Sequence, residues 1–233
     1  MRKVILFDLD GTLLPMNQDE FVRSYFEQLA RKLAPHGYGH RELLDAVWKG
    51  MSAMIRNDGK ESNEQAFWRV FRGIFGEGVM KDYPAFEEFY QKEFENVRTV
   101  CGFAPQAAQV IHALREAGCR VALATNPLFP AVATNARIRW AGLAREDFEL
   151  VTTYENSRFC KPNLDYYREI VRTLGVRPEE CLMVGNDVSE DMVAEELGME
   201  VFLLTDCLIN KDGADISRYP SGGFGALRAF LGQ

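Results

Sequence analysis

Short apolar segments alternate with amphipathic segments over the last 135 residues of the chain, and this alternation constrains the fold more than any other feature. The apolar segments predict β-strands because they are too short for helices and rich in β-branched residues, and they lie at 121–125, 148–153, 182–184 and 201–204. The amphipathic segments predict helices at 105–117, 131–140, 166–174, 191–197 and 224–231. Strands that alternate with helices form a parallel sheet, so we expect an α/β, Rossmann-like fold with helices on both faces.

One further strand is predicted far ahead of the others. Residues 3–9, KVILFDL, form a short β-branched apolar run that ends before Gly11. The residues that follow it have helical spacing instead, as in Val22, Phe26, Leu29 and Leu33. We therefore expect residues 1–14 and 99–233 to form the α/β body and residues 15–98 to form an inserted, all-helical domain.

The composition excludes several classes of protein. With 47% hydrophobic and 26% charged residues, the chain has the composition of a globular protein and not of a disordered one. A net charge of −7 without a basic tract argues against a nucleic-acid partner. No apolar run approaches the ~18 residues of a membrane span, and Asp8 and Asp10 interrupt the run where a signal peptide would continue. Five cysteines without close pairing indicate reduced thiols, so we expect a cytoplasmic protein whose oligomeric state stays open.

Polar residues follow the predicted strands at the positions where a parallel sheet binds its ligands. Ligands bind at the carboxyl ends of the strands in such a sheet. The residues that we expect to meet there are Asp8, Asp10, Gly11, Thr12, Thr125, Asn126, Lys161, Asn186, Asp187 and Asp191. Carboxylates this close repel one another, so a bound cation is nearly required, and the oxygen ligands suit Mg²⁺. A metal, a nucleophile and cationic groups for phosphoryl oxygens together indicate phosphoryl-transfer chemistry.

Four segments of the chain resemble the four motifs of the haloacid dehalogenase (HAD) superfamily, in the family's order. Residues 7–12, FDLDGT, resemble the first motif, and residues 124–126, ATN, the second. Residues 160–162, CKP, resemble the third, and Gly185-Asn186-Asp187-x-x-x-Asp191 resembles the fourth. The helical insertion resembles the family's C1-type cap only in position and type. The resemblance otherwise covers most of the chain.

The resemblance implies a role for each site residue. Asp8 would be the nucleophile that forms an aspartyl-phosphate, and Asp10 would be the general acid and base. Asp8, the backbone carbonyl of Asp10 and Asp187 would bind Mg²⁺. Lys161 would neutralise the nucleophile and the phosphoryl group. Thr125 and Asn126 would bind the phosphoryl oxygens. Asn186 and Asp191 would lie behind the residues that touch the substrate, where Asp191 would orient Lys161 or a metal-bound water.

Asp10 favours a phosphatase within this superfamily. True haloacid dehalogenases lack an aspartate there, because a halide leaves without a proton whereas an alkoxide needs one. We therefore expect a hydrolase of phosphoric monoesters, with a small phosphorylated molecule as its substrate. Residues 15–17, PMN, depart from the acidic or hydroxyl residue that many capped members carry, which argues against a sugar-phosphate mutase or a phosphoglycolate phosphatase.

Three alternatives stay open at this point. A phosphomutase would share the site, and so would a phosphonate hydrolase that forms a Schiff base with one of the insertion's lysines at 32, 49, 60, 81 or 92. A non-catalytic binding protein on the same scaffold would be expected to lack the nucleophile or the acid, and both are present.

Other patterns in the sequence have simpler explanations. His36 and His40 have the i, i+4 spacing of a metal pair, but Gly37 and Gly39 break the helix, so both are interpreted as loop residues. The glycine-rich residues 221–225 lack the preceding strand of a dinucleotide site and are interpreted as a turn before the last helix. The insertion holds 14 of the 27 aromatic residues, most of which we expect in its core. Met16, Phe21 and Met54 are candidates for an apolar wall over the substrate.

Overall fold

A five-stranded parallel sheet forms the centre of the body in the computed structural model, which describes residues 2–232. The strand order is β2-β1-β3-β4-β5, so the first strand of the chain lies between two later ones. The strands are β1 (Val4–Phe7), β2 (Arg120–Leu123), β3 (Cys181–Gly185), β4 (Glu200–Leu204) and β5 (Ser221–Gly222). The expected parallel α/β sheet is thereby confirmed.

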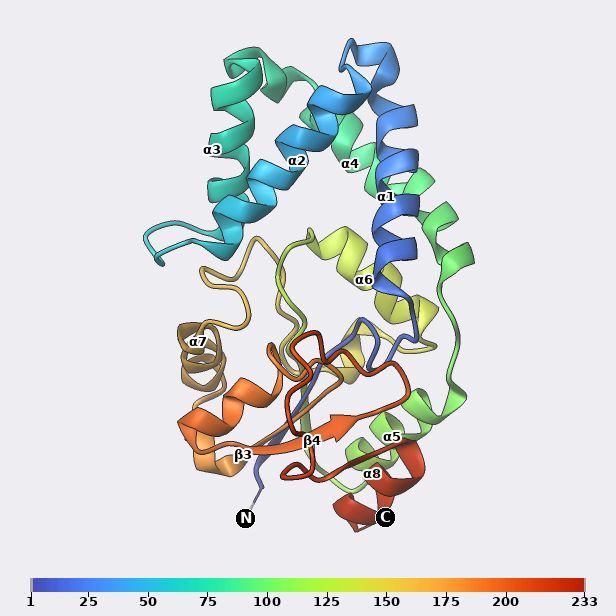
Figure 1. Ribbon diagram of the computed structural model, residues 1–233, viewed down its shortest axis with the longest axis vertical. Coiled ribbons are helices and arrows are strands. Elements are labelled where there is room, and N and C mark those ends of the chain that lie inside the picture. Colours follow the sequence, from blue (N-terminus) through green and yellow to red (C-terminus); the bar gives the residue numbers. More distant parts are fainter. Residues whose placement is uncertain (1, 233) are drawn as a thin grey trace.

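Helices cover both faces of this sheet. The body helices are α5 (Pro105–Glu116), α6 (Ala131–Trp140), α7 (Leu164–Leu174) and α8 (Phe224–Leu231), with the short 3₁₀ helices η4 (Arg145–Asp147), η5 (Pro178–Glu180) and η6 (Met192–Leu197). Because side chains alternate along a strand, Ile5 and Phe7 of β1 pack with α5 and α8, whereas Val4 and Leu6 pack with α7. Figure 1 shows α5 and α8 on the opposite side of the body from α7.

The helical part forms a separate layer beyond the carboxyl ends of the strands (Figure 1). Its helices are α1 (Gln18–Leu33), α2 (His40–Ile55), α3 (Asn63–Phe75) and α4 (Tyr83–Gln91), with the 3₁₀ helices η1 (Ala34–His36), η2 (Glu77–Lys81) and η3 (Glu93–Val100). Local sequence sets several of their starts. Asn17 caps α1 by accepting from Asp19 N and Glu20 N, and Ser62 and Gln65 form a capping box at α3.

Two backbone connections join the helical layer to the body, and they lie side by side. Gly102 N donates to Pro15 O at 2.7 Å, and Met16 pairs with Cys101 in an antiparallel bridge. Phe94 of η3 stacks on Trp140 of α6, with ring centroids 5.1 Å apart. A single cluster of buried apolar residues therefore runs from the helical layer into one face of the body.

One predicted strand is almost absent. Residues 148–153 run beside β2, but only Val151 forms a bridge, with Leu123. Leu150 O accepts from Leu123 N, and Thr152 N donates to Leu123 O. The next bond of a parallel ladder, from Tyr154 N to Thr125 O, is replaced, because Tyr154 N donates to Phe129 O and Thr125 O accepts from Thr152 Oγ1 and Tyr166 Oη.

Two smaller expectations are partly wrong. Residues 221 and 222, interpreted as a turn, form the edge strand β5, and Gly223 then caps α8. His40, interpreted as a loop residue, begins α2. His36 ends η1, where its Nδ1 lies 2.9 Å from Asp82 Oδ1.

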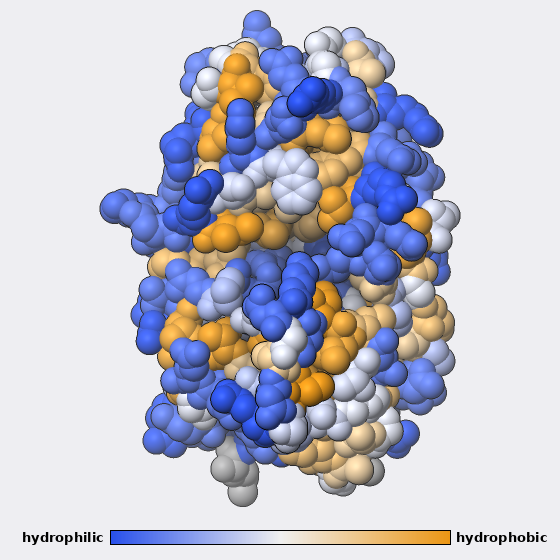
Figure 2. Space-filling model, viewed as in Figure 1, coloured by the Kyte–Doolittle hydropathy of each residue, from blue (hydrophilic) through white to orange (hydrophobic). Residues whose placement is uncertain are grey.

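The surface mixes polar and apolar groups. On the face shown in Figure 2, hydrophilic and hydrophobic residues are interspersed over both the helical layer and the body. Among residues 2–232, no helix is both long enough and apolar enough to cross a membrane.

Candidate active site

The ends of three adjacent strands bring the sequence-predicted residues to one edge of the sheet. In the parallel register, Phe7 lies opposite Leu123 of β2 and Val184 of β3. Asp8, the first residue after β1, therefore lies between two other loops. Thr125 and Asn126 follow β2 on one side, and Asn186 and Asp187 follow β3 on the other. The expected convergence at the carboxyl ends of the strands is present in the structure.

A buried lysine lies at the centre of this edge. Lys161 Nζ donates to Asp8 Oδ1 at 2.8 Å and to Asp191 Oδ1 at 2.6 Å, and its side chain is 1% exposed. Burial alone would lower the pKa of Lys161, but the carboxylates of Asp191 and Asp8 raise it well above its ordinary value. The lysine therefore carries a fixed positive charge directly beside Asp8.

Asp187 and Asp191 lock the loop after β3. Asp191 Oδ2 accepts from Asp187 N at 2.9 Å, and burial raises the pKa of Asp191. Asp187 Oδ1 accepts from Ser189 N, Ser189 Oγ and Glu190 N, as an N-terminal cap does. Gly185 leaves the room that this arrangement needs, because a Cβ at that position would lie 2.1 Å from Asp191 Oδ2.

Two carboxylates at this edge suit a magnesium ion. Lys161 occupies only Oδ1 of Asp8, and the loop donors occupy only Oδ1 of Asp187. Among residues 2–232, neither Oδ2 has a hydrogen-bond donor. Residues 2–232 hold no group of three or more His, Cys, Asp or Glu side chains arranged for a metal ion. A site with two carboxylates, one backbone carbonyl and water is of the kind that Mg²⁺ takes, so the donor set fits this ion.

Asp10 is turned toward a partner that the sequence did not indicate. Its Oδ2 accepts from Arg137 of α6, and the Arg137 side chain is completely buried. Asp10 Oδ1 is buried and has no hydrogen-bond partner among the described residues. Burial raises the pKa of Asp10 to about 6, although the Arg137 guanidinium lowers it. Asp10 therefore keeps one oxygen fixed and the other available.

Side-chain hydrogen bonds fix the residues that follow β2. Thr125 is buried, and its carbonyl accepts from Thr152 Oγ1 at 2.7 Å and from Tyr166 Oη at 2.9 Å. Asn126 Nδ2 donates to Glu190 Oε2 at 3.0 Å, while Asn126 Oδ1 is buried without a partner. Burial raises the pKa of Glu190 to about 7.

Asn186 supports the loop after β1. Its Oδ1 accepts from Thr12 Oγ1 at 2.9 Å, and its Nδ2 donates to Cys207 O at 2.7 Å. The loop passes so close that a Cβ at Gly11, where φ is +84°, would lie 2.3 Å from Asn186 Nδ2. Asn186 therefore fixes the loop that carries Asp8 and Asp10.

Arg137 and Glu190 are the site residues that sequence reasoning missed. Arg137 lies in a helix whose apolar residues show no clear face, and a helical arginine is normally interpreted as exposed. Glu190 lies inside the fourth motif, between the two aspartates that were recognised. Met16, Phe21 and Met54, the proposed apolar wall, are all buried in the structure.

The chain is similar to known hydrolases over almost its whole length. The family model of haloacid dehalogenase-like hydrolases matches residues 2–197. A glyceraldehyde 3-phosphate phosphatase of Methanothermobacter thermautotrophicus is 26% identical over 234 residues, which cover 93% of this chain and 95% of that protein.

Solved structures show the same fold. A HAD phosphatase from Thermococcus onnurineus aligns with a TM-score of 0.58 and 22% identity, over 100% of this chain and 98% of that one. A 2-haloacid dehalogenase from Pseudomonas syringae pv. tomato aligns with a TM-score of 0.68 and 20% identity, over 100% of this chain and 99% of that one. Phosphatases and dehalogenases thus share this fold, and the chemistry of the site has to distinguish them.

Proposed function

Because the chain belongs to the haloacid dehalogenase-like hydrolases, we propose that it is a Mg²⁺-dependent phosphatase that hydrolyses a small phosphomonoester. The observation that carries this proposal is the buried contact of Lys161 with Asp8 at the carboxyl end of β1, with Asp10 two residues further along. The similar glyceraldehyde 3-phosphate phosphatase supports the same reaction class.

Asp8 is the proposed nucleophile. Lys161 orients its carboxylate through Oδ1, so that one carboxylate oxygen can approach phosphorus in line with the leaving oxygen while the other can hold the metal. The bond from Asp8 to phosphorus forms as the bond from phosphorus to the leaving oxygen breaks, which gives an aspartyl-phosphate. Lys161 and the Thr125–Asn126 segment are positioned to bind phosphoryl oxygens.

Asp10 is the proposed acid and base. In the first step its free Oδ1 gives a proton to the leaving oxygen. In the second it takes a proton from the water that attacks phosphorus, while the bond from phosphorus to Asp8 breaks and phosphate leaves. A pKa of about 6 suits both directions of proton transfer near neutral pH. An aspartate at this position favours phosphate esters over haloalkanoates, since a departing halide needs no proton.

Mg²⁺, held by Asp8, Asp187 and the carbonyl of Asp10, would offset the negative charge of the carboxylates and the phosphoryl group. The chain's own residues support that role, since Asp191 and the cap donors fix the position of Asp187.

The test is hydrolysis of p-nitrophenyl phosphate with and without Mg²⁺. We expect chelation to abolish turnover and Asp8→Asn to lower kcat at least about 10³-fold, because the amide cannot act as the nucleophile. Asp165→Asn, at an exposed carboxylate of α7, is the matched control and should keep full activity. Turnover by Asp8→Asn at the native rate would contradict the assignment.

A second measurement follows Mg²⁺ without turnover. Binding to the folded state should raise the Tm of the native protein, and Asp187→Asn should reduce that rise. An equal rise in both proteins would exclude Asp187 as a ligand.

A further inference from the structure

The start of α3 forms a second contact between the helical layer and the body. Figure 1 shows the connection between α2 and α3 on the other side of the molecule from the start of α1. Asn63 N donates to Ser157 O at 2.9 Å. Glu64 N donates to Tyr154 O, also at 2.9 Å. The first N–H groups of a helix have no partner within the helix, so the body supplies the acceptors for these two.

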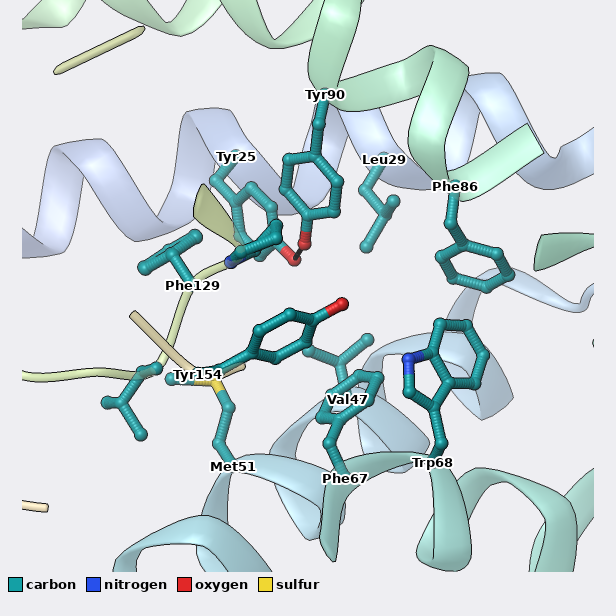
Figure 3. Close-up of a pocket in the computed structure, with 12 residues that line it drawn as sticks. Tyr25, Leu29, Val47, Met51, Phe67, Trp68, Phe86, Tyr90, Phe129 and Tyr154 are labelled. Atoms are coloured by element: carbon teal, nitrogen blue, oxygen red, sulfur yellow. Dashed lines mark hydrogen bonds between the residues drawn. The ribbon is translucent and has the colours of Figure 1, made fainter. Parts of the chain in front are cut away.

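Apolar side chains surround these hydrogen bonds. Met54 of α2 forms a buried cluster with Tyr154 and Cys160 of the body, and Met51 and Phe67 pack against this cluster. Figure 3 shows the ring of Tyr154 next to Met51 of α2 and Phe67 of α3. The body segment that leads to the lysine of the candidate site therefore packs against the helical layer.

One buried side chain at this contact reaches two loops of the body. Asn63 is completely buried, and its Nδ2 carries two N–H groups. Nδ2 donates to the backbone carbonyls of Pro127 and Phe159, each at 3.4 Å. It also donates to Cys160 Sγ at 3.3 Å. A single amide of the helical layer therefore joins the loop after β2 to the loop before α7.

These two loops carry the groups that are proposed to bind the phosphoryl oxygens. Pro127 directly follows Asn126, and Cys160 directly precedes Lys161. The atoms that Asn63 contacts therefore lie one residue away from both groups. A misplacement of about 1 Å at a reacting centre can lower a rate about 100-fold, so the position of these loops matters for the chemistry.

The Asn63 amide is itself oriented by its neighbours in the helical layer. Its Oδ1 accepts from Asn57 Nδ2 at 3.0 Å, and Asn57 Nδ2 also donates to Glu61 O at 2.9 Å. Asn57 Oδ1 accepts from Gly59 N at 3.2 Å. Because its oxygen is occupied within the layer, Asn63 presents its N–H groups to the body. The backbone hydrogen bonds and the apolar cluster already attach the layer, and the Asn63 side chain adds the contact that reaches both loops.

We propose that Asn63 is a positioning residue, whose amide fixes the two loops that present Asn126 and Lys161 to the phosphoryl group. This inference rests on the proposed phosphatase function and adds a residue of the helical layer to it. Within residues 2–232, no hydrogen bond joins Asn63 to a proposed metal ligand. Loss of the amide should therefore weaken phosphate binding and leave Mg²⁺ binding as it is.

The test is the dissociation constant of inorganic phosphate, measured by isothermal titration calorimetry with Mg²⁺ present. We expect Asn63→Ala to raise this constant at least about fivefold, while the rise in Tm on addition of Mg²⁺ stays native. An unfolded fraction would lower the stoichiometry of the titration but not its dissociation constant, so a merely structural role would leave the constant unchanged. An unchanged constant would overturn the proposed positioning role.

The phosphatase function is tested separately on the native protein. Mg²⁺-dependent hydrolysis of p-nitrophenyl phosphate together with an unchanged phosphate constant in Asn63→Ala would overturn the role of Asn63 alone. No hydrolysis by the native protein would instead overturn the phosphatase function.

Two further variants separate the amide from the stability of the helix start. Gln65→Ala removes the acceptor of Ser62 N in the capping box of α3, and within residues 2–232 no hydrogen bond of Gln65 reaches either loop. This control should lower the Tm and keep the native phosphate constant. Asn63→Ser keeps a polar group that is too short to reach both loops, and it replaces Asn63→Ala if that variant does not fold. A Gln65→Ala protein that binds phosphate as weakly as the Asn63 variant would also overturn the proposal.

Discussion

At the scale of single residues, the pair of Arg137 and Asp10 is the feature that most shapes the proposed chemistry. A completely buried arginine occupies one oxygen of the carboxylate, and the other stays free. The planar guanidinium fixes the carboxylate in a way that an ammonium group cannot. We therefore expect Arg137 to be a positioning residue, which acts on the substrate only through Asp10.

Replacement of Arg137 should separate positioning from stability. We expect Arg137→Lys to lower kcat about 10- to 100-fold with little change in KM, because it keeps the charge but loses the planar contact. Arg137→Met leaves Asp10 buried and unpaired, and should lower the free energy of unfolding by roughly 3 kcal/mol. Steady-state kinetics and urea unfolding measure the two effects.

Arg139→Lys is the matched control, since Arg139 lies two residues along α6 but is 60% exposed and pairs with Glu95. A native kcat in Arg137→Lys would show that Asp10 needs no such partner.

Some of the candidate site residues could be predicted from the sequence, and others could not. Asp8 and Asp187 follow strands and Lys161 lies in a short motif, so their convergence could be predicted from strand order together with the motifs. Arg137 could not, because it reaches Asp10 across 127 positions and only the packing of α6 against the first loop brings them together. A helix without a clear apolar face gives no signal that one of its charged residues is buried.

At the scale of elements, side-chain competition for backbone groups explains where the sequence-based reading was wrong. The stretch 148–153 has the composition of a strand, and Val151 does pair with β2. The hydroxyls of Thr152 and Tyr166 then occupy the Thr125 carbonyl, which would be the next acceptor of the ladder, and no apolar pattern in the sequence indicates this. Helix starts depend on more local contacts, because caps such as Asn17 and Ser62 accept from backbone groups within four residues of themselves.

The ion pairs of Glu88, one of which joins α4 to α1, should make the stability of the folded protein depend on pH in the acidic range. Glu88 accepts from Lys32 at 2.7 Å and from Lys92 at 2.6 Å, and these hydrogen bonds lower its pKa to about 2. A carboxylate with a lower pKa in the folded state stabilises that state above its unfolded pKa, ~4.3, and loses this effect as the pH falls toward 2. The native protein should therefore have a higher Tm than Glu88→Gln at pH 7, and the difference should shrink between pH 5 and pH 2.5.

Glu87→Gln is the control for this titration, because the neighbouring Glu87 forms no ion pair within residues 2–232. Its Tm difference from the native protein should show no such decline. A Glu88→Gln difference that is constant from pH 7 to pH 2.5 would contradict the role of these pairs.

At the scale of the whole molecule, one apolar cluster joins the helical layer to the body. It includes Tyr25 and Phe94 of the layer and Trp140 and Phe148 of the body. Such a shared core couples the stabilities of the two parts, because neither can unfold without exposing the apolar surface of the other.

We expect a single unfolding transition as a result. Far-UV circular dichroism, which reports all helices, and tryptophan fluorescence, from Trp48, Trp68 and Trp140, should give the same urea midpoint. Phe94→Ala removes the ring that stacks on Trp140 and should cost about 3–5 kcal/mol. Two separated transitions in the native protein would show that the parts fold independently.

The paired connections at Pro15 and Gly102 have a consequence for how such a protein can diversify. The helical layer leaves the body and returns to it at one point, held by the hydrogen bond between these two residues. A different set of helices could be joined at that point with the sheet, Asp8 and Lys161 left as they are. Insertions are tolerated where both ends of the inserted segment meet at one surface position. The residues at the edge of the sheet and the helices that lie beyond them can therefore be replaced independently of one another.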